Sequence, residues 1–98
     1  MTMLIRDAIR RRVMLRVNYD PGERLVEPHT YGESKDGNFL LRAFQVSGAS
    51  QSNEHVNWKL FRIDRMVSVS LSDQTFSGPR PDYNPDDKAM KGDVIERL

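Results

Sequence analysis

The spacing of the apolar residues changes at Val13, and this change limits the fold more than any other feature of the sequence. Between positions 4 and 9 the apolar residues recur as on one face of a helix, which predicts a short amphipathic helix. In the segment 13–19 they stand two apart, as in a strand with one buried face. The chain is therefore predicted to begin with a helix that leads directly into a β-sheet.

Turn residues divide the next segment into two further strands. Asp, Pro and Gly at 20–22 predict a turn, and the segment 25–31 then reads as a second strand. Pro28 within it indicates an edge position or a bulge, because proline cannot donate to the sheet. The Asp-Gly pair at 36–37 predicts a hairpin, and the segment 39–46, apolar on both faces, is expected to be a central third strand.

Two more strands complete the predicted sheet. After a polar loop at 48–55, the segments 56–62 and 67–71 read as the fourth and fifth strands. The four residues 63–66 between them are too few for a helix and predict one 3₁₀ turn. A helix followed by five short strands, the last two joined by one turn, is the order of a small SH3-like or Sm-like barrel. Closure of such a barrel would also remove exposed strand edges.

The length of 98 residues predicts a single domain with an extension. We place the barrel domain at 1–76 and a Pro-rich, acidic C-terminal extension at 77–98. The segment 87–98 is expected to form a short C-terminal helix, although Gly92 weakens that expectation.

Opposite charges gather at the two ends of the chain. Residues 1–16 carry five arginines and one aspartate, whereas residues 82–98 carry five acids and three bases. A basic front is compatible with nucleic-acid binding, and equally with the acidic tail folding back onto the front of its own or a neighbouring chain. Composition leaves both interpretations open.

The sequence lacks the residues of the common catalytic and metal sites. There is no cysteine, no phosphate-binding glycine loop and no nucleophile elbow, and His29 and His55 stand at no metal-ligand spacing. No apolar run approaches the length of a membrane span, and the N-terminus does not resemble a secretory signal. We therefore expect a non-enzymatic cytoplasmic protein with no metal and no cofactor.

The stretch WKLFRIDRM at 58–66 carries Lys59, Arg62 and Arg65 at a three-residue step within apolar surroundings. Either these cations pair with acids and cap the 3₁₀ turn, or they face a ligand. Guanidinium groups suit phosphate oxygens. Arg65 lies in the turn itself, which favours a structural role. Trp58 is expected in the core rather than as a stacking platform, because its surroundings are apolar.

Further candidates for the ligand-binding set come from the second and third strands. Arg42 repeats the pattern of a cation among apolar residues, and Arg24 is a third arginine that we expect to converge with Arg42 and Arg62 on one face. Tyr31 and Phe39 offer flat surfaces beside them, and such surfaces suit nucleobases. For Arg42 and Arg62 the structural and the functional interpretation remain equally open.

The order of these motifs resembles a family over about residues 4–72. DAI at 7–9 and LRVNY at 15–19 are similar to its first helix and strand, RLVEP at 24–28 to its second strand, and KLFRIDRM at 59–66 to its basic last motif. The resemblance is to the WYL domain, a bacterial SH3-like regulatory module. The naming triplet is Asn-Phe-Leu here, at 38–40, and Lys59 replaces an arginine. The resemblance implies the ligand-sensing part of such regulators without the winged helix-turn-helix, often as a homodimer.

We therefore predict a ligand-sensing or regulatory domain that binds a nucleotide or single-stranded nucleic acid through an arginine-lined face. The alternative is a protein-interaction or assembly module whose basic face binds acidic protein segments. Salt dependence separates them, because binding to single strands weakens steeply with salt for every neutralised phosphate.

Overall fold

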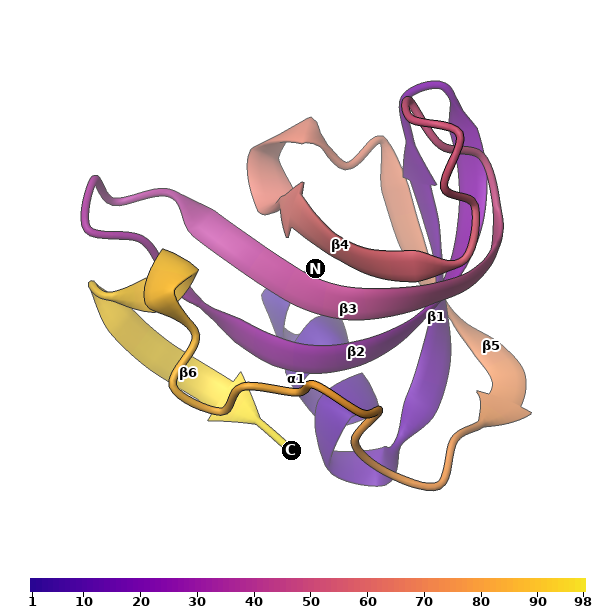
Figure 1. Cartoon of the computed structure of the whole chain (residues 1–98). Helices are drawn as coiled ribbons and strands as arrows, with labels where there is room; N and C mark the ends of the chain where they lie inside the picture. Colours follow the sequence, from indigo (N-terminus) through magenta and orange to yellow (C-terminus); the bar gives the residue numbers. More distant parts are fainter.

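The computed structural model of the chain describes residues 1–98, which fold into one α-helix, six β-strands and two 3₁₀ turns (Figure 1). All six strands are antiparallel and belong to one open sheet. In chain order the elements are α1 (Thr2–Arg11), β1 (Val13–Tyr19), β2 (Gly22–Glu33), β3 (Phe39–Gly48), β4 (Asn57–Arg62), η1 (Ile63–Arg65), β5 (Ser68–Thr75), η2 (Lys88–Met90) and β6 (Asp93–Arg97). The mainly β prediction with an N-terminal helix is confirmed.

The helix α1 packs its apolar face against the sheet. Ile5, Ala8 and Ile9 are buried, in agreement with the spacing seen in the sequence. Arg12 takes the left-handed conformation, with φ of 55°, and its backbone N–H donates to the carbonyls of the last turn. The helix therefore ends there, and β1 starts with the next residue.

The strands follow the order β4-β3-β2-β1-β5, so β4 and β5 each pair with one neighbour along this path. The predicted hairpin joins β2 to β3, with Gly37 at a φ of 85° in its loop. The register of β2 and β3 shifts between Pro28 and Thr30, which is the bulge that proline predicts. The expected 3₁₀ turn between the fourth and fifth strands is also present, as η1.

The prediction of a C-terminal helix over 87–98 is wrong. The segment forms the short turn η2 and then β6, which pairs with the second half of β2 from Thr30 to Glu33. β1 pairs only with the first half of β2, up to Val26, so the remaining backbone groups on that side of β2 need another partner. Gly92 allows the close approach, because a Cβ there would meet the backbone oxygens of Glu33 and Ser34.

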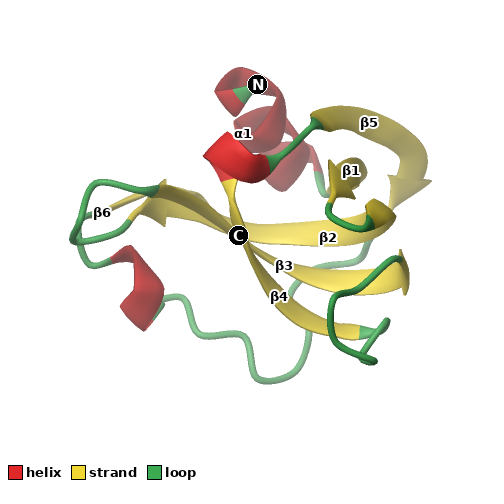
Figure 2. Ribbon diagram, turned by 90° about the horizontal axis from the view of Figure 1, so that it is seen from above, coloured by secondary structure: helices red, strands yellow, loops and turns green.

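Other segments of the chain cover part of both faces of the sheet. Figure 2 shows α1 on one side of the sheet and the segment 77–90, called the strap below, on the other. The main core lies on the α1 side, where Leu41, Ala43 and Phe61 contact the helix residues and β1. On β4, Phe61 therefore faces this core, while Leu60 on the opposite face remains 41% exposed.

The outer strand β5 and the residue before it leave apolar side chains exposed. Val67 precedes the strand and is 74% exposed, and Leu71 is 38% exposed although it stands opposite Leu15. Because β5 has a neighbour on one side only, its apolar residues are covered by β1 but not by a further strand. None of the helices has the length and apolarity to span a bilayer.

Candidate functional site

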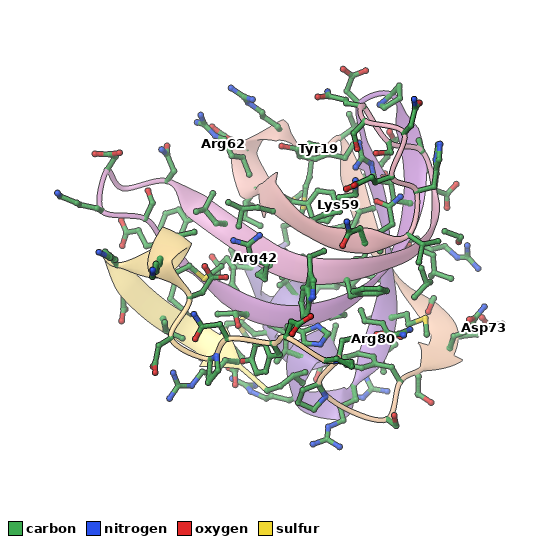
Figure 3. All side chains as sticks on the ribbon, viewed as in Figure 1. Tyr19, Arg42, Lys59, Arg62, Asp73 and Arg80 are labelled. Carbon is green, nitrogen blue, oxygen red and sulfur yellow. The ribbon has the colours of Figure 1, made fainter.

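Arg42 and Arg62 lie on the same face of the β3–β4 pair, as predicted from their pattern (Figure 3). Arg42 stands opposite Leu60 and Arg62 opposite Leu40, and residues two apart on a strand share a face. This is the face turned away from α1. Arg24 does not join them, because it stands two residues from Val26, which faces the core.

The strap occupies the part of this face around Arg42. Asp87 accepts two hydrogen bonds from the Arg42 guanidinium, from Nε at 2.7 Å and from Nη2 at 3.3 Å. Burial raises the pKa of Asp87, but the hydrogen bonds from Arg42 and from the Ala89 N–H outweigh it, so the pKa is lowered. Arg42 is therefore already paired with a carboxylate of its own chain.

Trp58 is half-buried beneath the same strap. The ring of Tyr83 stacks on it with the centroids 6.4 Å apart, and the ring of His29 meets it edge-on at 4.7 Å. The expectation of a core position is thus met only in part, because Trp58 lies under the strap and not in the main core. Its face cannot serve as a stacking platform while Tyr83 covers it.

The strap is fixed to β2 by Glu27 and His29. The Arg80 guanidinium donates to both carboxylate oxygens of Glu27, at 2.7 and 3.0 Å, and lies over the ring of Phe44. The backbone N–H of Arg80 donates to Nε2 of His29, so the proton of this neutral ring is on Nδ1, which donates to the Glu27 carbonyl. Burial is the largest effect on His29 and lowers its pKa.

Arg62 and Arg65 differ in their partners. Arg62 donates to both carboxylate oxygens of Asp64, at 3.1 and 2.8 Å, and to the side-chain oxygen of Asn38 at 3.2 Å. The hydrogen bond to Asp64 raises the pKa of Arg62. Arg65 lies in η1 with its side chain exposed and forms no ion pair. The acid-pairing interpretation is therefore realised for Arg62 and not for Arg65.

Tyr31 and Phe39 form one wall of the largest cavity, which has a volume of about 510 Å³ and is called the aromatic pocket below. Their rings are stacked with the centroids 6.3 Å apart. The pocket lies between the start of α1, the β2–β3 hairpin, η1 and β6. Its lining residues are Thr2, Arg6, Tyr31, Gly37, Asn38, Phe39, Ile63, Asp64 and Ile95. Arg62 stands at its rim, hydrogen-bonded to two of these residues.

The polar groups of the aromatic pocket are balanced in charge. Arg6 donates from Nε to Glu96 at 3.2 Å, and Asp64 is held by Arg62. Tyr31 is only 3% exposed, its pKa is raised by burial, and its hydroxyl forms no hydrogen bond within the protein. No buried side-chain polar atom of the protein lacks a partner, so this hydroxyl is itself accessible and can bond a ligand in the pocket.

Arg24 and Lys59 line a different, smaller cavity of about 270 Å³, called the cationic pocket below. It lies between the β1–β2 turn, the loop at 48–55 and β4. Its lining residues are Tyr19, Arg24, Ser50, Gln51, Ser52, Lys59, Leu60 and Phe61, none of which lines the aromatic pocket. Six of the seven predicted residues are thus spread over the aromatic pocket and its rim, the strap contact and the cationic pocket, and Arg65 lies apart from all three in η1.

Sequence reasoning missed the buried polar residues that position these sites. Gln45 is fully buried and ties Arg24 to the loop at 48–55, and His29 and Glu27 anchor the strap. A glutamine within the apolar segment 39–46 is a signal that could have been used, because a buried amide needs several partners. The partners of Glu27 and His29 lie more than fifty residues away, and no local pattern indicates them.

The chain holds no group of three or more His, Cys, Asp or Glu side chains that could bind a metal ion. Comparison with protein-family models, with curated proteins and with solved structures returned no match for this chain.

Proposed function

We propose that this protein is a non-enzymatic ligand-sensing or regulatory domain that binds a nucleotide or single-stranded nucleic acid. The observation that carries the proposal is the stacked pair of Tyr31 and Phe39 in the wall of the largest cavity, with Arg62 at its rim. Flat aromatic faces favour nucleobases, and a guanidinium favours the phosphate that follows them.

The dimensions and the chemistry of the aromatic pocket agree with such a ligand. A volume of about 510 Å³ is within the range of small-molecule sites in proteins. Phe39 is 45% exposed, which leaves its ring accessible to a base, and the Tyr31 hydroxyl is free to donate to a ring nitrogen or a ribose oxygen. The side-chain amide NH₂ of Asn38 provides a further donor, since the oxygen of the same amide accepts from Arg62.

We place the domain among WYL-like modules with an SH3-like or Sm-like barrel. The strand order β4-β3-β2-β1-β5, the N-terminal helix and the 3₁₀ turn before β5 support this placement. As in such modules, the protein would act in the cytoplasm in transcription regulation, as a homodimer. The sheet would be the open form of the barrel, extended by β6.

A binding experiment with labelled ligands tests the proposal. The anisotropy of a fluorescent AMP derivative and of short single-stranded RNA and DNA would be measured with the wild type, Phe39→Ala and the control Val67→Ala. We expect Phe39→Ala to weaken binding about tenfold, because one stacking contact contributes about 1–3 kcal/mol. Val67 is 74% exposed and lines no pocket, so its variant should bind like the wild type. Equal binding by all three proteins would refute the proposal.

The alternative of a protein-interaction module has its own supporting observation. The basic groups of the chain already bind acidic groups of its own C-terminal segment: Asp87 binds Arg42, and Glu96 binds Arg6 and Arg10. A partner with a similar acidic segment would use the same contacts. This function predicts that an acidic peptide with the sequence of residues 82–98 binds the intact protein, and that Arg42→Gln abolishes this binding.

A further inference from the structure

We propose that the cationic pocket between the β1–β2 turn, the loop at 48–55 and β4 is a second binding site, which takes a dianionic phosphate monoester. It shares no lining residue with the aromatic pocket, so this proposal does not depend on the proposed function.

The first reason to expect an anion in the cationic pocket is Arg24, which is a buried cation without an acidic partner. It is 4% exposed, and its guanidinium donates to the carbonyls of Tyr19 and Asp20, at 3.1 and 2.6 Å, and to the Gln45 side-chain oxygen at 3.4 Å. All three acceptors are neutral, and two of its five N–H groups have no partner. A buried charge is costly unless an opposite charge is near.

Asp20 acts on the charge of Arg24 electrostatically but forms no ion pair with it. The carboxylate of Asp20 accepts a hydrogen bond from Gln51 Nε2 at 3.0 Å. Burial lowers the pKa of Arg24, and this effect exceeds those of Tyr19 and Asp20 in the opposite direction. The guanidinium also lies 5.3 Å from the ring centroid of Tyr19 and 5.4 Å from that of Phe61. These rings hold it in place without neutralising it.

Lys59 adds a second cation that meets hydroxyl groups only. Its ammonium donates to Ser50 Oγ at 3.0 Å and to Ser52 Oγ at 3.4 Å, and the two hydroxyls are 3.1 Å apart. Hydroxyl groups can turn to donate toward an anion. The pocket therefore offers two positive charges and several neutral donors.

The loop that carries the serines is fastened at both ends by Gln45. Gln45 Nε2 donates to the carbonyls of Ala49 and His55, at 2.8 and 3.1 Å, and so joins both ends of the loop. Gly48 has a φ of 108°, and a Cβ there would collide with the backbone of Glu23. The donors are thus positioned before a ligand arrives, which lowers the entropic cost of binding.

The size and charge of the pocket select a terminal phosphate. A volume of about 270 Å³ is small for a whole nucleotide but sufficient for a phosphate group and the first atoms attached to it. A monoester carries close to two negative charges at neutral pH, which match the two cations, whereas a diester carries one. A sugar phosphate, a free nucleotide or the 5′-phosphate of a nucleic acid would present the same group.

The test uses the ¹⁵N-labelled intact chain and three probes at constant ionic strength: inorganic phosphate, methyl phosphate and dimethyl phosphate. Backbone amide shifts would be followed in the wild type, in Lys59→Gln and in the control Lys91→Gln, whose side chain is exposed and forms no ion pair. We expect saturable shifts confined to residues 19–24, 48–55 and 59–61. Methyl phosphate should bind at least about tenfold more tightly than dimethyl phosphate, and Lys59→Gln should weaken it about tenfold.

Three outcomes would overturn the inference. These are shifts that spread over the exposed lysines and arginines without saturation, equal affinity of the monoester and the diester, or equal binding by Lys59→Gln and Lys91→Gln. Arg24→Gln is a second variant, expected to abolish the shifts. If it does not fold, the Lys59 comparison still decides the question. Comparing AMP with 5′-phosphorylated and unphosphorylated RNA distinguishes a small molecule from a nucleic-acid end.

Discussion

Asp87 holds Arg42 by two hydrogen bonds, although the residues lie 45 positions apart in the chain. The side chain of Asp87 is 9% exposed and that of Arg42 is 28% exposed, so water screens the pair only in part. The same carboxylate accepts from the Ala89 N–H at the start of η2. One contact therefore joins strand β3 to the strap and fixes the turn that precedes β6.

Replacement of Asp87 by asparagine should destabilise the protein by about 1–3 kcal/mol, because a half-buried arginine loses its charged partner. Asp64→Asn is the matched control. It also removes a carboxylate that binds an arginine, but its side chain is 64% exposed, and exposed pairs contribute little. Urea unfolding of the three proteins measures the difference. Equal midpoints for the two variants would contradict the structural role of the strap.

The stability should fall as the pH drops from about 7.5 to 5.5, because His29 is neutral in the folded protein. Its pKa is lowered by burial, whereas in the unfolded chain it is about 6.5, so the unfolded state binds the proton more strongly. The stabilisation by His29 is complete at pH values above its pKa in the unfolded chain. It is lost as the pH falls toward the pKa of His29 in the folded protein. The loss should be on the order of 1 kcal/mol, seen in urea unfolding at both pH values. An equal midpoint of urea unfolding at the two pH values would refute this prediction.

Glu96 should contribute a second pH dependence at lower pH. Burial raises its pKa, but the hydrogen bonds from Arg10 and Arg6 outweigh this effect, and the pKa is lowered. The contribution of Glu96 to stability is complete at pH values above its pKa in the unfolded chain, which is about 4.3. It is lost as the pH falls through the pKa of Glu96 in the folded protein. Acid unfolding followed by circular dichroism should therefore be less steep in Glu96→Gln. A curve parallel to that of the wild type would show that the pairing does not stabilise the protein.

Trp58 is the single tryptophan and reports on the strap. In Tyr83→Ala its ring loses the stacked partner and becomes more exposed to water, so its fluorescence emission should move to longer wavelength. The variant should also lose about 0.5–1.5 kcal/mol of stability from the aromatic pair alone. Val67→Ala, at a side chain that is 74% exposed and lies outside the strap, serves as the control. An unchanged emission maximum in Tyr83→Ala would mean that the strap does not cover Trp58 in solution.

The local part of the fold was predictable from the sequence. The change of period at Val13, the Asp-Gly pair at 36–37 and the short polar link at 63–66 each indicate an element by properties of neighbouring residues. The segment 93–97 gave no such signal, because it is a strand only through its pairing with the unpaired half of β2. Its apolar residues fit a helix equally well when that partner is unknown.

The sequence identifies the candidate residues by their cationic or aromatic side chains. Where these side chains lie depends on how the strands pair. Arg42 and Arg62 share a sheet face because Arg42 pairs with Leu60, which stands two residues before Arg62 on β4. Arg24 and Lys59 meet in the cationic pocket on account of the loop at 48–55, which the sequence marks only as polar. Asp64, which pairs with Arg62, is only two residues away, but Asp87, which pairs with Arg42, is 45 positions away, and no local pattern indicates that contact.

The most direct measurement of the proposed function is a nuclear Overhauser experiment on the protein saturated with AMP. We expect cross-peaks between the base protons of the nucleotide and the ring protons of Tyr31 and Phe39, together with the side chains of Ile63 and Ile95 that line the same pocket. Cross-peaks to Trp58 alone, or none at saturating AMP, would contradict the assignment of the aromatic pocket as the nucleotide site.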